Sequence, residues 1–441
     1  MADAPRTSSN RQSVFTASFP PLSPTTLSPS KVRTPLGPVA RRTAALLVVT
    51  QMIGWGTTYH LPIILGPRMS EDLGVPLEVI YGGLTIMLLV SAFLSPRIGA
   101  MIDRMGAGRF LISGSIFAAT GLTLLANSKS IPVYAAAWLF FGLTQACMLG
   151  NAAFVALARV AGAQARRAIS TMLLFTAANP FIFYPISAWL SGAVGWRSMC
   201  LIYAALHVCV GLPVQALIAR QKPAARPAGS DEASEAELRG ALPSADRRGA
   251  FWLIAIAFTG QAFVGWGLSP HMINILSALG VPAASAIFLA SLHGPAQTAG
   301  RLIDFGSRGE MPPMTMGLIA ATLAPIGLVV LIFGGQSEAA ALLGIGLYGM
   351  SAGLNTVIRA TIPLNLFGRE AYGATLGKIA LPMNIACAVA PILFAALISR
   401  VGPAESLLAA AGIAALVLGV MMFLARRTRA ALSPASAAAR A

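Results

Sequence analysis

The chain has 441 residues, of which 56% are hydrophobic and only 10% are charged. A soluble domain carries about 25% charged residues, because its surface must interact with water. The composition therefore excludes an ordinary soluble enzyme and disorder along the whole chain, and it favours a membrane protein. The net charge of +16 does not indicate nucleic-acid binding, because the basic residues lie mostly between long apolar runs, as the positive-inside bias requires.

The first 40 residues are rich in Ser, Thr and Pro and contain no apolar segment that is typical of a signal peptide. A segment of this composition cannot bury enough apolar surface to fold. We therefore expect residues 1–40 to form a disordered cytosolic tail.

Apolar runs follow one another from residue 41 to residue 426, each long enough for the roughly 20 residues of a spanning helix. One polar stretch, 220–248, interrupts them. We expect an all-α integral membrane fold of twelve transmembrane helices, with six-helix bundles at 41–219 and 249–426, a cytosolic linker at 220–248 and a cytosolic tail at 427–441. The expected helices are 43–67, 76–98, 108–127, 131–158, 167–193, 197–219, 249–277, 282–303, 312–334, 338–364, 371–398 and 403–426.

The basic residues indicate the orientation of these helices. With both termini in the cytosol, all but four of the 31 basic residues lie on the cytosolic side or at cytosolic helix ends. The reverse orientation inverts this ratio. We expect a multi-pass protein of a bacterial inner (plasma) membrane with both termini in the cytosol. The four exceptions are Arg68, Lys129, Arg197 and Arg400.

The two halves of the chain repeat each other. Four short motifs recur in the same order at a nearly constant offset of roughly 200 residues, which chance does not explain. We expect two pseudo-symmetric bundles with the substrate between them near the bilayer midplane. The matching motifs are Gly54-Trp55-Gly56 with Gly265-Trp266-Gly267, Leu73–Pro76 with Leu279–Pro282, Gly99–Asp103 with Gly300–Asp304, and Gly142-Leu143 plus Asn151 with Gly346-Leu347 plus Asn355.

The segment Gly99-Ala-Met-Ile-Asp103-Arg104-Met-Gly106-Ala-Gly108-Arg109 resembles the loop signature between helices 2 and 3 of the major facilitator superfamily. Gly195-Trp196-Arg197 before the sixth expected helix also resembles that superfamily. The resemblance covers the chain from about residue 40 and implies a transporter whose signature loop latches the cytosolic side. An ordinary short turn with positive-inside charges is the alternative. The expected gating residues are Gly99, Asp103, Arg104, Gly106, Arg109 and, in a weaker second copy, Asp304.

Histidines are the candidate proton-binding residues, because no Asp or Glu lies within a helix core. His60 and His271 occupy matching positions of the repeat, and His293 lies in the eighth expected helix. We expect proton coupling through one of these three. An ordinary hydrogen-bonded contact between helices is the alternative for each, and it is the interpretation we adopt for His207.

Polar residues on the tenth expected helix recur at intervals of three and four, which places them on one face. They are Tyr348, Ser351, Asn355 and Arg359. The matching fourth helix has Asn151 but no arginine. Because no helix core contains a carboxylate that could pair with Arg359, its guanidinium favours an anionic substrate. The alternative is that Arg359 extends to the membrane interface, which we favour for Lys378.

Other candidate substrate-binding residues follow from helical faces and from the repeat. Tyr59-His-Leu-Pro62 resembles the Tyr-x-x-Pro of the monocarboxylate-porter branch, where the tyrosine faces the substrate. The paired Asp and Arg of that branch's eighth helix are absent here. The expected substrate-binding residues are Gln51, Trp55, Tyr59, His60, Asn151, His271, Gln297, Tyr348, Asn355 and Arg359.

These features predict a secondary active transporter of a small organic solute, expected to be anionic and carboxylate-like, that works by alternating access. The alternative is an efflux pump for amphipathic or drug-like compounds, although the helix 4 and helix 5 signatures of drug–proton antiporters are absent. We expect no enzymatic activity, cofactor, metal or nucleic-acid partner, and a monomer in the lipid bilayer. The four cysteines lack zinc spacing and are interpreted as small apolar residues, namely Cys147, Cys200, Cys209 and Cys387.

Overall fold

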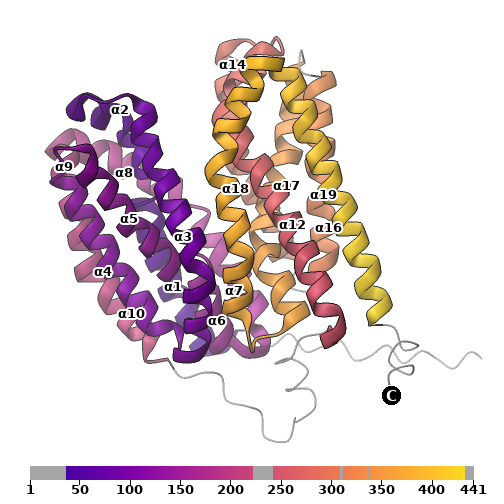
Figure 1. Ribbon diagram of the computed structural model, residues 1–441, viewed down its shortest axis with the longest axis horizontal. Helices are drawn as coiled ribbons and strands as arrows, with labels where there is room; N and C mark the ends of the chain where they lie inside the picture. Colours follow the sequence, from indigo (N-terminus) through magenta and orange to yellow (C-terminus); the bar gives the residue numbers. More distant parts are fainter. Residues whose placement is uncertain (1–35, 222–241, 308–310, 335–336, 433–441) are drawn as a thin grey trace, which may run out of the picture. The chain divides into compact units, whose positions relative to one another are not determined.

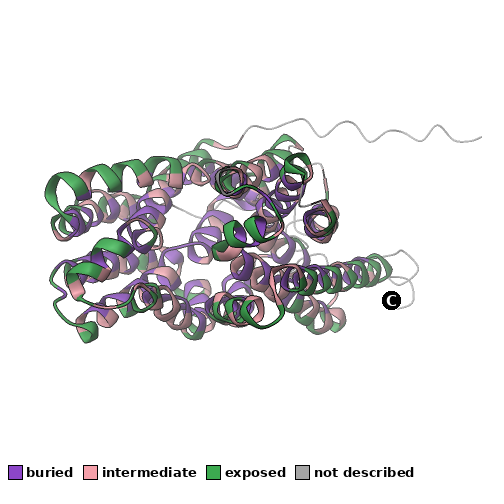
Figure 2. Cartoon of the chain, turned by 90° about the horizontal axis from the view of Figure 1, so that it is seen from above, coloured by how far each residue is buried: buried purple, intermediate pink, exposed green. Residues whose placement is uncertain are grey.

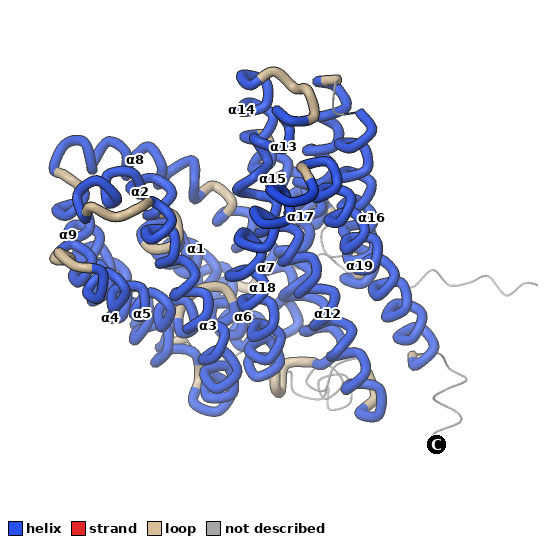
Figure 3. Tube along the Cα trace, turned by 45° about the horizontal axis from the view of Figure 1, so that its top comes forward, coloured by secondary structure: helices blue, strands red, loops and turns tan. Residues whose placement is uncertain are grey.

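The computed structural model describes four stretches of the chain, namely residues 36–221, 242–307, 311–334 and 337–432. These residues form helices and connecting turns without a strand (Figure 3). We call residues 36–221 the N-terminal half and residues 242–432 the C-terminal half. Most of the expected tail at 1–40, of the linker at 220–248 and of the tail at 427–441 lies outside the described residues.

The helices of the N-terminal half, coloured indigo to magenta in Figure 1, follow the expected order. They are α1 (Pro38–Thr57), α2 (Leu61–Leu73), α3 (Leu77–Met105), α4 (Ala107–Ala126), α5 (Ile131–Cys147), α6 (Asn151–Ala161), the short 3-10 helix η1 (Gly162–Gln164), α7 (Ala165–Thr176), α8 (Asn179–Val194), α9 (Trp196–Leu206), the π-helix η2 (His207–Gly211) and α10 (Leu212–Ala219).

The C-terminal half has the same plan. Its helices are α12 (Ser244–Leu268), the short 3-10 helix η3 (Ser269–His271), α13 (Met272–Ala278), α14 (Ala283–Ser291), α15 (His293–Gly306), α16 (Pro313–Gly334), α17 (Glu338–Phe367), α18 (Tyr372–Val401) and α19 (Pro403–Ala431). Each of the twelve expected ranges therefore contains one helix or several consecutive ones. The all-α fold of two six-helix bundles is confirmed.

The helices are apolar enough to cross a membrane. Among the described residues, nine helical stretches are long and apolar enough to cross a membrane. One of them, Ile131–Val194, has 64 residues and is long enough for two crossings. Exposed residues lie on the outer faces of the helices (Figure 2), and many are large and apolar, such as Trp189, Phe333 and Leu416. An apolar outer surface of this kind contacts hydrocarbon, so the protein is a multi-pass membrane protein.

Several expected spans are interrupted, which the hydropathy of the sequence did not reveal. In the fourth span, α5 ends at Cys147 and α6 begins at Asn151. Gly150 between them has φ 53° and ψ −99°, in the positive-φ region that favours glycine. The neighbours Met148 and Leu149 are apolar and buried, so the break does not interrupt the apolar run.

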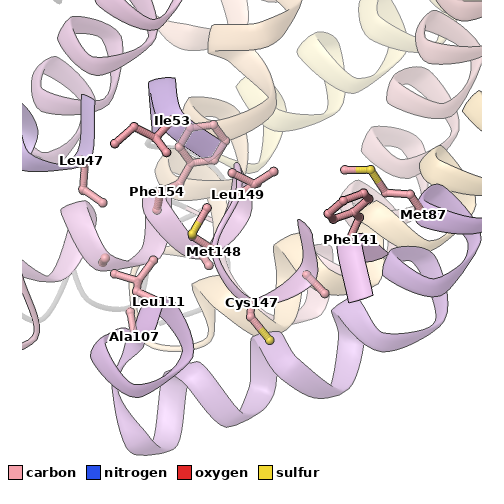
Figure 4. Close-up of a cluster of buried hydrophobic side chains, with 14 of the residues drawn as sticks. Leu47, Ile53, Met87, Ala107, Leu111, Phe141, Cys147, Met148, Leu149 and Phe154 are labelled. Carbon is pink, nitrogen blue, oxygen red and sulfur yellow. The ribbon is translucent and has the colours of Figure 1, made fainter. Parts of the chain in front are cut away.

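The core of the N-terminal half packs around this break. Figure 4 shows Leu111, Met148 and Phe154 among the buried side chains of this cluster. Glycines bring the helices close together: a Cβ atom on Gly114 would lie 2.4 Å from the Cβ atom of Met148. Such close packing by small residues stabilises membrane helices, because burial away from water contributes little between helices inside lipid.

The two halves meet along α3 and α18, which lie side by side (Figure 1). A Cβ atom on Gly99 would lie 2.1 Å from the carbonyl oxygen of Gly373, so the backbones touch there. Further along, a small apolar cluster joins Leu88 of α3 to Met383 and Cys387 of α18. Two glycines and this cluster therefore fix the distance between the halves.

A set of polar contacts, which we call the clamp, joins the ends of α2 and α4 to the start of α9 in the N-terminal half. Asp72, in the last turn of α2, accepts hydrogen bonds from Arg197 at 2.7 Å and from Trp196 Nε1 at 3.1 Å. Arg197 also donates to the carbonyl oxygens of Ala126, the last residue of α4, and of Ser128 in the turn that follows. The ends of α2, α4 and α9 are thus held together by contacts within one half.

Candidate functional site

The break between α5 and α6 is held by a glutamine from α1. Gln51 Nε2 donates to the carbonyl oxygen of Met148 at 2.9 Å, and its Oε1 accepts from the backbone N–H of Gly150 at 3.1 Å. Both polar atoms of this buried side chain are therefore used by the backbone. Gln51 was expected to bind substrate, but in this structure it supports the break.

Arg359 of α17 reaches across to the same break. A Cβ atom on Gly150 would lie 3.4 Å from its Nη2 atom. Its Nη1 atom lies 3.6 Å from the sulfur of Met383, and its Nε atom is buried without a hydrogen-bond partner among the described residues. Tyr372 and Cys387 are near enough to interact with it electrostatically. The guanidinium thus lies between the two halves and has no acidic partner in the part of the chain that the structure describes.

Aromatic residues from both halves meet around Tyr59. The Tyr59 ring lies edge-on to Trp55 at 5.5 Å and to Trp266 at 5.3 Å between ring centroids. His60 follows at 5.1 Å from Tyr59, and Tyr184 lies 5.3 Å from His60 and within hydrogen-bond distance of its Nδ1 atom, at 3.2 Å. We call these five residues the aromatic cluster. The two matching Gly-Trp-Gly motifs of the repeat thus meet at one tyrosine.

The polar face expected on α17 divides in two. Tyr348 donates to the carbonyl oxygen of Val264, and Ser351 donates to that of Ala320, so both point into the C-terminal half. Asn355 donates to the carbonyl oxygen of Ser351 in its own helix. Arg359 is the member of this face that reaches the N-terminal half.

The three candidate proton-binding histidines lie apart from one another. His271 Nε2 lies 3.1 Å from the carbonyl oxygen of Pro391, whereas His60 lies in the aromatic cluster. His293 Nε2 lies 3.0 Å from Nε2 of Gln297, and its Nδ1 atom is buried with no partner among the residues described. His207 is buried in the N-terminal half, with Nε2 2.8 Å from the hydroxyl of Thr57.

The signature loop makes a contact between the halves. The carboxylate of Asp103 accepts hydrogen bonds from the backbone N–H groups of Gly373 at 2.9 Å and Ala374 at 2.7 Å, in the first turn of α18. An anion is stabilised at the positive end of a helix dipole. Gly106 turns the chain between α3 and α4 at φ 87°, and Arg104 and Arg109 are exposed. We call the Asp103 contact the α3 latch.

The second copy of the signature also joins the halves. Asp304 of α15 accepts a hydrogen bond from Ser170 at 2.5 Å and pairs with Arg166 at 3.3 Å, both on α7. Arg301 donates to the carbonyl oxygen of Leu173 on the same helix, at 3.4 Å. We call this set the α15 latch.

Sequence reasoning missed the residues that complete this second latch. The second copy is weaker in the sequence because Phe305 stands where Arg104 follows Asp103, whereas the arginine that pairs with Asp304 comes from α7. The repeat could have identified it, because α7 begins at Ala165 and its counterpart α18 begins at Tyr372. Because Asp103 contacts the start of α18, the repeat predicts that Asp304 contacts the start of α7.

Solved structures with the same fold include two transporters. The human organic anion transporter MFSD10 (TETRAN) superposes with a TM-score of 0.67 at 16% sequence identity, covering 87% of this chain and 100% of that chain. The transporter FucP in its outward conformation superposes with a TM-score of 0.65 at 13% identity, covering 88% of this chain and 99% of that chain. At these identities the similarity shows the fold alone. No curated protein gives a significant match.

The family assignment comes from the sequence itself. A family model described as Major Facilitator Superfamily matches residues 45–381, which is well over half of the chain. The match includes both copies of the signature and the first eleven of the twelve helical ranges, in part or in full. The chain belongs to the Major Facilitator Superfamily.

Proposed function

We propose that the protein is a secondary active transporter that moves a small organic anion, of carboxylate type, by alternating access. The observation that carries this proposal is Arg359, whose guanidinium lies between the halves with its Nε atom buried and unpartnered among the described residues. An isolated cation away from water is unfavourable until an anion pairs with it. A transported carboxylate supplies that partner.

The break in the fourth span strengthens the attraction for an anion. The helix α6 starts beside Arg359, and its N-cap residue, Gly150, has no side chain to cap the N–H groups of the first turn. The first N–H groups of a helix carry partial positive charge, and interrupted membrane helices in transporters direct such ends at anionic substrate groups. Asn151, the first residue of α6, is partly exposed. Arg359 and the start of α6 together favour one carboxylate group.

The two latches support alternating access. Both join the N-terminal half to the C-terminal half through an aspartate in the same position of the repeat. We place the latch end and both chain termini in the cytosol of a bacterium, because the basic residues gather on that side. Opening the latches then exposes Arg359 to the cytosol. The transporter acts as a monomer, with the substrate gradient or protons as the energy source.

The test measures binding and counterflow in proteoliposomes with labelled monocarboxylates, neutral sugars and lipophilic cations. Native protein is expected to exchange monocarboxylates. Arg359→Gln removes a charge-assisted contact and should weaken carboxylate binding by about 10- to 100-fold. Arg359→Lys keeps the charge without the planar fork, so it should bind more weakly than native protein without reversing the preference for anions.

Lys378→Gln is the matched control, because Lys378 is an exposed cation on α18. It should bind like native protein. Normal carboxylate affinity in both Arg359 variants would contradict the proposal. Export of lipophilic cations by native protein would instead support an efflux pump for amphipathic compounds.

A further inference from the structure

The aromatic cluster forms a surface of rings, set edge to face, at the contact between the halves. Trp55 and Tyr59 come from the N-terminal half and Trp266 from the C-terminal half, and all three side chains are partly exposed. Their rings meet edge to face, a geometry in which an aromatic ligand also gains beyond the burial of its area. This surface favours a planar ring.

Arg359 and the aromatic cluster both contact the same segment of α18, from Met383 to Cys387. On α18, Met383 contacts Arg359, and Cys387 interacts electrostatically with both Arg359 and Tyr59. Trp266 packs against the apolar cluster that contains Met383 and Cys387. Four residues of helix rise about 6 Å. A ligand that reaches both places therefore needs roughly this distance between its charge and its ring, along an apolar wall.

The charges around this site match a single carboxylate. Arg301 is bonded to Thr356 and to the carbonyl oxygen of Leu173, and Lys378 is exposed. Arg359 is thus the cation that faces the break. A second negative charge on the ligand would lie against the aromatic cluster or the apolar wall, away from Arg359, and a buried charge without a cation beside it is disfavoured.

We propose that the substrate is an aryl-alkanoic acid: one carboxylate on Arg359, and an aromatic ring about 6 Å away against Trp55, Tyr59 and Trp266. This inference rests on the proposed anion transport and names the substrate class. It places the ring beside the contact of Tyr59 with Trp266, where the two Gly-Trp-Gly motifs meet, so both halves contact the substrate. Release of the ring requires the halves to separate at Tyr59 and Trp266.

The experiment measures the affinity of purified protein, by calorimetry and by competition in counterflow, for five probes that differ by one feature each. They are 3-phenylpropionate, propionate without the ring, 3-cyclohexylpropionate with a non-aromatic ring, 3-phenylpropanamide without the charge, and phenylsuccinate with a second charge. We expect 3-phenylpropionate to bind at least about tenfold more tightly than each of the others.

Variants of the protein test the contact with the ring and the contact with the carboxylate independently. Trp266→Leu and Trp55→Leu should lower the preference for 3-phenylpropionate over propionate by about tenfold, whereas Arg359→Gln should remove the preference over the amide. Trp252→Leu is the matched control, because Trp252 is on α12 but 57% exposed. It should leave both preferences unchanged. Trp266→Phe keeps a ring and should retain most of the preference, and it serves as the test if the leucine variants do not fold.

The outcomes distinguish this inference from the proposed function. Equal binding of 3-phenylpropionate and propionate, or of the phenyl and cyclohexyl acids, overturns the aryl assignment while anion transport stands. Tight binding of phenylsuccinate overturns the inference that the substrate carries a single carboxylate. If no acid binds better than the amide and Arg359→Gln changes nothing, the proposed function is wrong and this inference falls with it.

Discussion

At the scale of single residues, two polar side chains meet at the break between α5 and α6: Gln51 bonds to its backbone, and Arg359 approaches Gly150. The polar face of its helix predicts Arg359 as an anion-binding residue, and the structure places it between the halves, where this role stays a prediction. Gln51 was identified by the same reasoning, but its two partners, Met148 and Gly150, lie about a hundred residues away. A helical wheel shows which face a residue occupies, and not what lies opposite.

Gln51→Leu tests the structural role of this glutamine. The change removes two buried hydrogen bonds and leaves the N–H of Gly150 without a partner, which should cost about 1–3 kcal/mol. Thermal unfolding in detergent should therefore shift to lower temperature, and Gln51→Glu should restore little because it lacks the donor to Met148. Native stability with lost substrate binding would instead return Gln51 to the binding site.

The histidines carry a second prediction at this scale. If one of His60, His271 and His293 couples protons, its replacement by Gln should leave solute exchange intact and abolish accumulation driven by a pH gradient. The measurement is uptake into proteoliposomes with and without the gradient. Accumulation retained in all three variants would exclude coupling through histidine.

At the scale of elements, the spans were predictable and the breaks were not. The apolar run from Ile131 to Ala161 continues through Met148, Leu149 and Gly150, so its hydropathy indicates one helix. The positive φ of Gly150 divides it, and a glycine in an apolar run has no feature that distinguishes a break from close packing. The part that the start of α6 plays in the proposed anion site therefore could not be predicted from the sequence.

Gly150→Ala should impair this element. The backbone of Gly150, at φ 53° and ψ −99°, lies in a region that strains alanine by about 1–3 kcal/mol, and the new methyl group would lie 3.4 Å from Arg359 Nη2. We expect weaker anion binding and a lower unfolding temperature. Gly192→Ala on α8 is the control, because nothing lies within 4 Å of its added Cβ atom. A Gly150→Ala protein that matches this control in both assays would show that the break tolerates a side chain.

At the scale of the whole molecule, the internal repeat was the most informative sequence feature. It predicted two related bundles, and the structure adds that the repeated aspartates, Asp103 and Asp304, both contact the opposite half. The distances between the halves could not be predicted, because they depend on backbone contacts such as Gly99 with Gly373. Sequence spacing contains no information on such contacts across 270 residues.

The two latches should act on one equilibrium. Asp103→Asn weakens an anion at a helix terminus, an effect of about 0.3–2 kcal/mol, and should change the balance between the two access states severalfold. Asp304→Asn should shift it in the same direction, and the effects should add in the double variant because the latches share no residue. Uptake kinetics and distances between spin labels across the latch end provide the measurement.

Glu78→Gln is the control, because Glu78 is exposed near the opposite end of α3. Unchanged kinetics and label distances in the double variant would show that the latches do not govern access. Opposite shifts in the two single variants would show that they act on different transitions.

The α3 latch also sets an order of events during synthesis. Asp103 bonds to residues 270 and 271 positions later, and at about 5–20 residues per second the ribosome needs roughly 15 to 50 s to reach them. The clamp at Asp72, Trp196 and Arg197 lies within the N-terminal half and forms earlier. The first bundle must therefore persist in the membrane, without the N–H groups of α18 on Asp103, until the start of α18 has been made.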